Sequence, residues 1–124
     1  MRENILVGFR PAALVSMNDR LHWSKANELR KLWQDSAFWI AKQNRIAPFE
    51  VFPVEVTVVF TTKQPNRRRD PHNFFPTVKH LIDGLTLAGL WPDDDSTHVT
   101  TREPLFVEGD GRSYQIILRS EVAT

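Results

Sequence analysis

Two charged stretches of the chain contain residues that could act on phosphate groups. Residues 67–73 have the sequence RRRDPHN, and residues 91–95 have the sequence WPDDD. Neighbouring charges of like sign repel one another, so the arginines favour a nearby anion and the aspartates favour a nearby cation. If the fold brings the stretches together, a polyanion and a divalent metal ion would balance their charges.

The available ligands favour a hard cation. The chain has no cysteine, so a thiolate site for zinc is excluded, and carboxylates favour Mg²⁺ or Mn²⁺ over zinc or copper. Of the sixteen basic residues, eleven are arginines, whose planar guanidinium suits phosphate oxygens. Each stretch also has an ordinary explanation, as a turn or helix cap for the aspartates and as a solvated edge for the arginines. Their occurrence on both sides of one predicted helix favours the functional interpretation.

The helix predicted between the two stretches adds a lysine. Its pattern begins near Pro76 and ends at Gly89, and at 100° per residue Lys79, Asp83 and Thr86 share one face. Lys79 and Asp83 are four residues apart, so a surface ion pair worth roughly a few tenths of a kcal/mol is one interpretation. The other is that Lys79 reaches a scissile phosphate while Asp83 orients it or helps to hold a metal. Spacing alone leaves both open.

A small set of helices and strands must position these side chains. At 124 residues the chain has the length of one domain, residues 1–124. The element order β-α-β-α-β-β predicts a two-layer α/β (α+β) domain with a mixed, partly antiparallel sheet. Periodicity and turn residues place strands at residues 4–9, 54–62, 97–103 and 114–119, helices at residues 25–44 and 76–89, and a turn at residues 109–111 between the last two strands.

Composition narrows the class of protein further. The chain has a net charge of +1, and 41% of its residues are hydrophobic. No run approaches the roughly 20 apolar residues of a membrane span, and the first residues lack the apolar core and cleavage site of a signal peptide. We therefore expect a soluble, cytoplasmic protein without a membrane partner.

Residues 67–99 resemble the RusA-type family of Holliday-junction resolvases, in particular its phage-type members. The resemblance rests on RRRDPHN, then KHLIDGL, then AGLWPDD, which follow the family's order. It implies a small α/β homodimer that acts on branched DNA, with carboxylates binding Mg²⁺ at a site in each subunit. It also implies a bacterial or phage-infected bacterial cell as the setting.

The resemblance assigns roles residue by residue. The catalytic residues it implies are Asp70, Lys79 and Asp94, and the candidate metal ligands are Asp70, Asp94, Asp93, Asp83 and His72. An upstream N-x-R-x-H-W segment at residues 18–23 matches phage-type members and implies a substrate contact. The candidate DNA-binding residues are Arg67, Arg68, Arg69, Asn73, Asn18, Arg20, His22 and Lys25.

Two departures from the family pattern bear on the metal site. The best-known members have Asp-x-Asp-Asn, whereas His72 replaces the middle carboxylate here. His72 could ligate a metal, contact phosphate or point away, and Asp83 or Asp95 could supply the missing charge. Three more residues separate Asn73 from Lys79, close to one helical turn, so Lys79 can still face the site.

The sequence thus predicts a Mg²⁺-dependent endonuclease that resolves four-way junctions by paired symmetric nicks. Three alternatives stay open. The first is a junction-binding protein of the same fold with weakened catalysis. The second is another metal-dependent phosphodiesterase or phosphohydrolase, acting on branched DNA or on nucleotides. The third gives the Asp run and the Arg triplet only structural and solubility roles.

Overall fold

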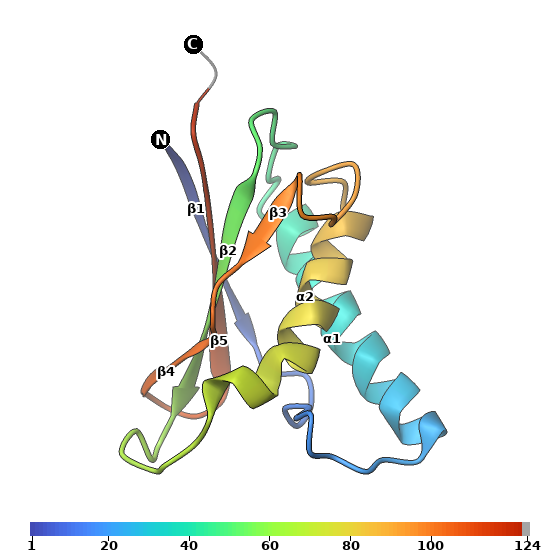
Figure 1. Ribbon diagram of the computed structural model, residues 1–124, viewed down its shortest axis with the longest axis vertical. Coiled ribbons are helices and arrows are strands. Elements are labelled where there is room, and N and C mark those ends of the chain that lie inside the picture. Colours follow the sequence, from blue (N-terminus) through green and yellow to red (C-terminus); the bar gives the residue numbers. More distant parts are fainter. Residues whose placement is uncertain (123–124) are drawn as a thin grey trace.

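A five-stranded mixed sheet and two α-helices make up the fold, which therefore belongs to the α+β class. The structure is a computed structural model and describes residues 1–122. In Figure 1 both α-helices lie on one side of the sheet, and the other side is left uncovered. The elements are β1 (Arg2–Phe9), α1 (Trp23–Gln43), β2 (Val54–Thr62), the 3₁₀ helix η1 (Pro71–Phe74), α2 (Phe75–Leu87), β3 (Val99–Thr101), β4 (Leu105–Glu108) and β5 (Ser113–Ser120).

β2 is the centre of the sheet. β5 runs antiparallel to β2 on one side and to β1 beyond it, while β3 and β4 both pair in parallel with the other side of β2. Val54, Val56, Val58 and Phe60 are fully buried, which confirms the alternation predicted for this strand and its bounds. A strand with neighbours on both sides gives the two helices a rigid base.

The two helices pack on the sheet and against each other. α1 buries Leu29, Trp33, Ala37 and Ala41, at the three- and four-residue spacing of one helical face. The two helices approach each other closely at Gly84 of α2, where a Cβ atom would lie only 2.2 Å from a backbone oxygen of α1. No larger residue fits there unless the helices separate.

The helix ends follow local chemistry. His22 caps α1, because its Nδ1 accepts a hydrogen bond from the Ser24 backbone N–H at 3.2 Å. α2 begins at Phe75, next to the proline expected in its first turn. Gly89 follows α2 with φ of 87°, a left-handed conformation that ends the helix close to the predicted position.

The predicted final strands were partly wrong. The strand expected at residues 97–103 is only Val99–Thr101, and the short β4 was not predicted. The turn at residues 109–111 does not join two neighbouring strands. It carries the chain across the end of β2, and the Asp110 carboxylate accepts hydrogen bonds there from the Thr61 hydroxyl at 3.0 Å and the Arg112 N–H at 2.8 Å. Anchoring to β2 replaces the hairpin that the turn residues suggested.

Within residues 1–122, no helix has the combination of length and hydrophobicity that crossing a membrane requires.

Candidate active site

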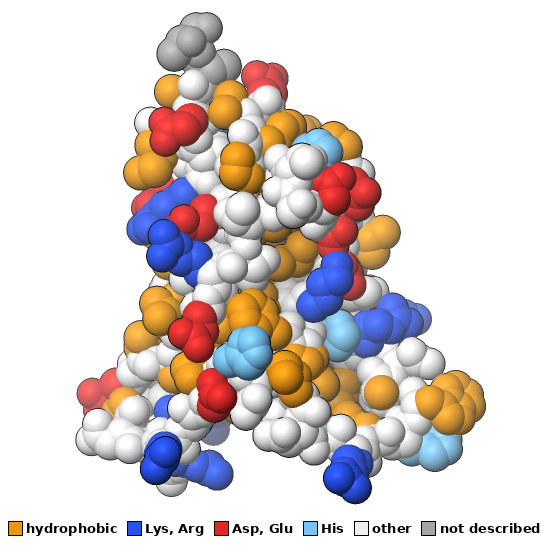
Figure 2. Space-filling view, viewed as in Figure 1, with side chains coloured by type: hydrophobic (Ala, Val, Ile, Leu, Met, Phe, Trp, Pro, Cys, Tyr) orange, Lys and Arg blue, Asp and Glu red, His pale blue; other side chains and the backbone are white. Residues whose placement is uncertain are grey.

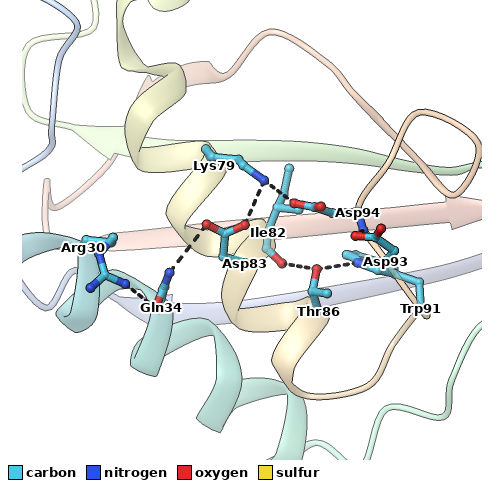
Figure 3. A network of polar contacts seen from close by, with 9 residues as sticks. All are labelled: Arg30, Gln34, Lys79, Ile82, Asp83, Thr86, Trp91, Asp93 and Asp94. Atoms are coloured by element: carbon cyan, nitrogen blue, oxygen red, sulfur yellow. Dashed lines mark hydrogen bonds and ion pairs between the residues drawn. The ribbon is translucent and has the colours of Figure 1, made fainter. Parts of the chain in front are cut away.

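Lys79 and two aspartates form a charged cluster on the exposed side of α2. The Lys79 Nζ lies 2.9 Å from Asp83 Oδ1, one helical turn further along α2, and it also pairs with Asp94 from the α2–β3 loop. Figure 3 shows the ammonium between the two carboxylates. The fold therefore brings Lys79 together with Asp94 of the Asp run, and it forms the Lys79–Asp83 ion pair that their spacing allowed.

A buried tryptophan fixes the loop that carries Asp94. The Trp91 side chain is buried, and its indole N–H donates to Thr86 Oγ1 of α2 at 2.7 Å. The Thr86 hydroxyl in turn donates to the Ile82 carbonyl oxygen at 2.9 Å. The Asp94 backbone N–H donates to Asp93 Oδ1 at 2.7 Å, so Asp93 supports the turn. This chain of contacts ties Asp94 to the same helix as Lys79.

Asp83 is held from α1. Gln34 of α1 donates from Nε2 to Asp83 Oδ2 at 3.5 Å, and Arg30 donates to Gln34 Oε1 at 3.2 Å (Figure 3). The close approach of the helices at Gly84 makes this contact possible. Gln34 and Gly84 were not predicted; a glycine inside a helix, where alanine is favoured by about 1 kcal/mol, was the available signal.

Lys79 and Asp94 each stabilise the charged form of the other. The hydrogen bond from Lys79 lowers the pKa of Asp94. Burial lowers the pKa of Lys79, but its hydrogen bonds to Asp94 and Asp83 outweigh that effect and raise it above the ordinary 10.5. One ammonium thus faces two carboxylates, and acidic side chains gather over the α2–β3 loop in Figure 2. Such a cluster attracts a further cation.

The carboxylates of this cluster suit a Mg²⁺ ion that is bound only in part by the protein. Within residues 1–122, no three histidine or carboxylate side chains lie close enough together to hold a metal by themselves. Asp83 and Asp94 already converge on one cation, the Lys79 ammonium. Mg²⁺ is commonly bound through one or two carboxylates, with waters and substrate phosphates completing its shell. These two aspartates suit that open mode rather than a cage of protein ligands.

Asp70 and His72 make their contacts outside the Lys79–Asp83–Asp94 cluster. Asp70 caps η1, because its carboxylate accepts a hydrogen bond from the His72 N–H at 3.2 Å. The His72 ring meets Phe75 edge-on, with the ring centroids 5.3 Å apart. In the described chain neither side chain has a hydrogen bond or ion pair with Lys79, Asp83 or Asp94. The predicted ligand set of Asp70, His72, Asp83, Asp93 and Asp94 is therefore not gathered into one group.

The loop between β1 and α1 docks on η1 and on the start of α2. The Met17 N–H donates to the Asn73 carbonyl oxygen at 2.7 Å. The buried Thr77 hydroxyl accepts from the Val15 N–H at 2.7 Å and donates to the Val15 carbonyl at 2.9 Å. The predicted upstream DNA-contact segment thus begins beside Asn73.

The individual DNA-contact candidates of this loop differ in their contacts. Asn18 and Arg20 are exposed. The His22 ring is occupied by Ser24 at the start of α1, and Lys25 pairs with Glu28 at 3.5 Å. Asn18 and Arg20 are open to a ligand, whereas the exposed His22 uses its Nδ1 in the helix cap.

Arg67, Arg68 and Arg69 line a pocket of about 270 Å³ beyond the end of β2. Arg69 donates to the Gln64 carbonyl oxygen at 3.1 Å, and its guanidinium lies 4.8 Å from the Phe106 ring centroid. Arg10, at the end of β1, lines the same pocket and was not predicted. In sequence its only signal was a charge directly after an apolar strand.

No known family of proteins matches this chain, and no characterised protein is similar to it at a significant level.

Proposed function

We propose that the chain is a divalent-metal-dependent endonuclease that cuts branched DNA, resolving four-way junctions by paired nicks. The observation that carries the proposal is the cluster of Lys79 with Asp83 and Asp94. Its residues are those that the resemblance to RusA-type resolvases singled out. A pocket lined by arginines on the same domain supports a polyanionic substrate.

Asp94 and Asp83 would hold Mg²⁺, or Mn²⁺ in its place. When bound, the ion would activate a water molecule and neutralise charge that develops on the phosphate. Lys79 carries three N–H donors, and it can exchange a carboxylate partner for a phosphate oxygen and so stabilise the transition state. Asp94, whose pKa is lowered, stays a carboxylate across the neutral range.

Arg67, Arg68 and Arg69 would contact backbone phosphates beside the cut, together with the exposed Arg20 and Asn18. Contacts of this kind position DNA without reading its sequence. Asp70 lies directly after the arginines, exposed, with a carboxylate whose only hydrogen bond in the described chain is to the His72 N–H. It is therefore free to act on substrate or metal.

Paired cuts on two symmetric strands require two sites, which a two-fold homodimer supplies. The uncovered face of the sheet supports self-association, since large apolar side chains lie exposed on β1 and β4. These are Ile5, Val7, Phe9, Leu105 and Val107. Exposed apolar side chains on the open face of a sheet are typical of a protein interface.

The test is cleavage of a labelled synthetic four-way junction and of a linear duplex of matching sequence, in Mg²⁺ and in EDTA. The proposal predicts symmetric nicks on the junction only, and only with the metal. Equal cutting of the linear duplex would remove the junction preference. Failure to cut either substrate in Mg²⁺ or Mn²⁺ would contradict the proposal.

A junction-binding protein without catalysis is the second candidate. It is favoured by one observation, that residues 1–122 gather no group of three metal-ligating side chains. This candidate predicts tight junction binding in EDTA and no cleavage in either metal.

A further inference from the structure

The pocket beyond the end of β2 has a basic lining with no acidic residue among the side chains that form it. Arg10, Arg67, Arg68 and Arg69 come from two distant parts of the sequence, and Phe74 and Phe106 line the same pocket. Four guanidinium groups around one hollow repel one another unless an anion balances them. In Figure 2, basic side chains mark the lower edge of the molecule, where the β2–η1 loop turns.

Arg10 is held in place before any ligand arrives. Its backbone N–H donates to the Arg112 carbonyl oxygen at 2.7 Å, and its guanidinium donates to the Thr61 carbonyl oxygen. The guanidinium carbon also lies 5.5 Å from the Phe60 ring centroid. An arginine that is anchored in this way loses little further freedom when it binds a ligand.

One polar atom of Arg10 is left without a partner. Arg10 Nε is fully buried and has no hydrogen-bond partner among the described residues. Buried donors are almost always paired, and an unpaired one destabilises the fold. Burial lowers the pKa of Arg10 and the Asp110 carboxylate raises it by its charge, but Asp110 does not line this pocket.

We propose that this pocket is a phosphate-binding site in which Arg10, Arg68 and the other two arginines hold one phosphate group. The volume of about 270 Å³ exceeds the roughly 10–15 Å³ that a single water needs, so a tetrahedral oxyanion fits with several waters. The ligand is a phosphodiester of the DNA backbone or a free phosphate, and the two share the same chemistry. The assignment of a DNA phosphodiester as the ligand rests on the proposed function, whereas the phosphate site itself does not.

The first test measures junction binding in EDTA, where no cleavage occurs, for wild type, Arg10→Gln and Arg45→Gln. Arg45 is exposed and lies in the turn after α1, so its replacement removes the same charge away from the pocket. We expect Arg10→Gln to weaken binding about 3- to 10-fold and to lower the salt slope by about 1, as loss of one phosphate contact does. Arg45→Gln should change neither quantity by a comparable amount.

The second test uses inorganic phosphate and thermal unfolding, at ionic strength matched with chloride. Phosphate should raise the unfolding temperature of wild type and of Arg45→Gln, and it should not raise that of Arg10→Gln. Arg68→Gln, at an exposed loop position, repeats both tests if Arg10→Gln does not fold.

The outcomes separate the two sources and the two proposals. Loss of the phosphate effect together with weaker junction binding supports a DNA phosphate in the pocket. Loss of the phosphate effect with unchanged junction binding supports a free phosphate instead. If Arg10→Gln and Arg68→Gln behave like Arg45→Gln in both tests, the site is overturned, whether or not the protein cleaves junctions.

Discussion

Individual residues of the site have separable roles in folding and chemistry, and Asp70 is the clearest case. Its carboxylate caps η1 through one hydrogen bond from the His72 N–H. Asparagine can accept the same hydrogen bond, so Asp70→Asn removes the charge and keeps the cap.

We predict that Asp70→Asn lowers junction cleavage by on the order of 100-fold or more, the loss typical of removing a group that stabilises a transition state. Junction binding and the free energy of unfolding should stay close to those of wild type. Single-turnover cleavage, binding in EDTA and urea unfolding measure the three quantities. Full cleavage by this variant would exclude Asp70 from the site.

His80 makes the stability of the fold depend on pH near neutrality. Its Nδ1 is buried and has no hydrogen-bond partner in the described chain. Burial lowers the pKa of His80 below the ordinary 6.5. The charge of Asp83 raises this pKa, whereas the charges of Arg30 and Lys79 lower it further. Below the ordinary value the unfolded chain takes up a proton that the folded His80 does not, so stability falls as the pH falls.

We predict that His80→Phe, which keeps a ring of similar shape, loses less stability than wild type between about pH 7.5 and about pH 5.5. Urea unfolding at both values gives the two free-energy differences. Other groups titrate equally in the two proteins, so the comparison isolates His80. Parallel pH dependence would show that His80 keeps its ordinary protonation in the fold.

At the scale of elements, the site depends on how closely α1 and α2 approach. A Cβ at Gly84 would lie 2.2 Å from the Gln34 carbonyl oxygen and 2.9 Å from Ala37 Cβ. These atoms belong to a packed helix and cannot move aside independently.

We predict that Gly84→Ala lowers the free energy of unfolding by about 1–3 kcal/mol through overpacking, despite the better helix propensity of alanine. Cleavage should fall as well, because Asp83 moves away from Gln34. The matched control is Leu87→Ala, an exposed position on the same helix, where a change within about 0.5 kcal/mol is expected. A Gly84→Ala protein as stable as wild type would show that the helices can separate at no cost.

The elements that sequence patterns predicted are those with enough residues to show a period. β2 alternates over its first five residues, and each α-helix buries one stripe, so both were predictable. β4 has four residues and ends close to a turn, which is too short for alternation to be visible. The turn at residues 109–111 has hairpin chemistry, but its contact with Thr61 is a tertiary one that local sequence does not show.

In the candidate site, too, contacts within one element were predictable from the sequence and contacts between elements were not. Lys79 and Asp83 are neighbours by helix geometry alone. The approach of Asp94 depends on Trp91 reaching Thr86, and the position of Arg10 beside the triplet depends on the order of strands in the sheet. Both are properties of the folded chain rather than of any segment.

At the scale of the whole molecule, the open face of the sheet bears on oligomeric state. β1 is an edge strand whose outward residues Ile5, Val7 and Phe9 are exposed. We predict that the chain, of 14.4 kDa, sediments as a dimer, and that Val7→Glu shifts it toward a monomer and uncouples the paired nicks. Leu87→Glu, an equally apolar exposed position on α2, is the control and should remain dimeric. A monomer that makes paired nicks at the same concentration would contradict this account of symmetry.

The most direct test of the central claim is single-turnover junction cleavage by Lys79→Met and Asp94→Asn, with binding measured in EDTA. Both side chains are partly exposed, with 56% of the Lys79 side chain and 20% of the Asp94 side chain accessible to solvent. Neither substitution should therefore unfold the protein. If the Lys79–Asp83–Asp94 cluster performs the chemistry, each variant binds the junction within a few-fold of wild type and loses cleavage by on the order of 100-fold or more. Wild-type cleavage by either variant would place the chemistry elsewhere in the chain.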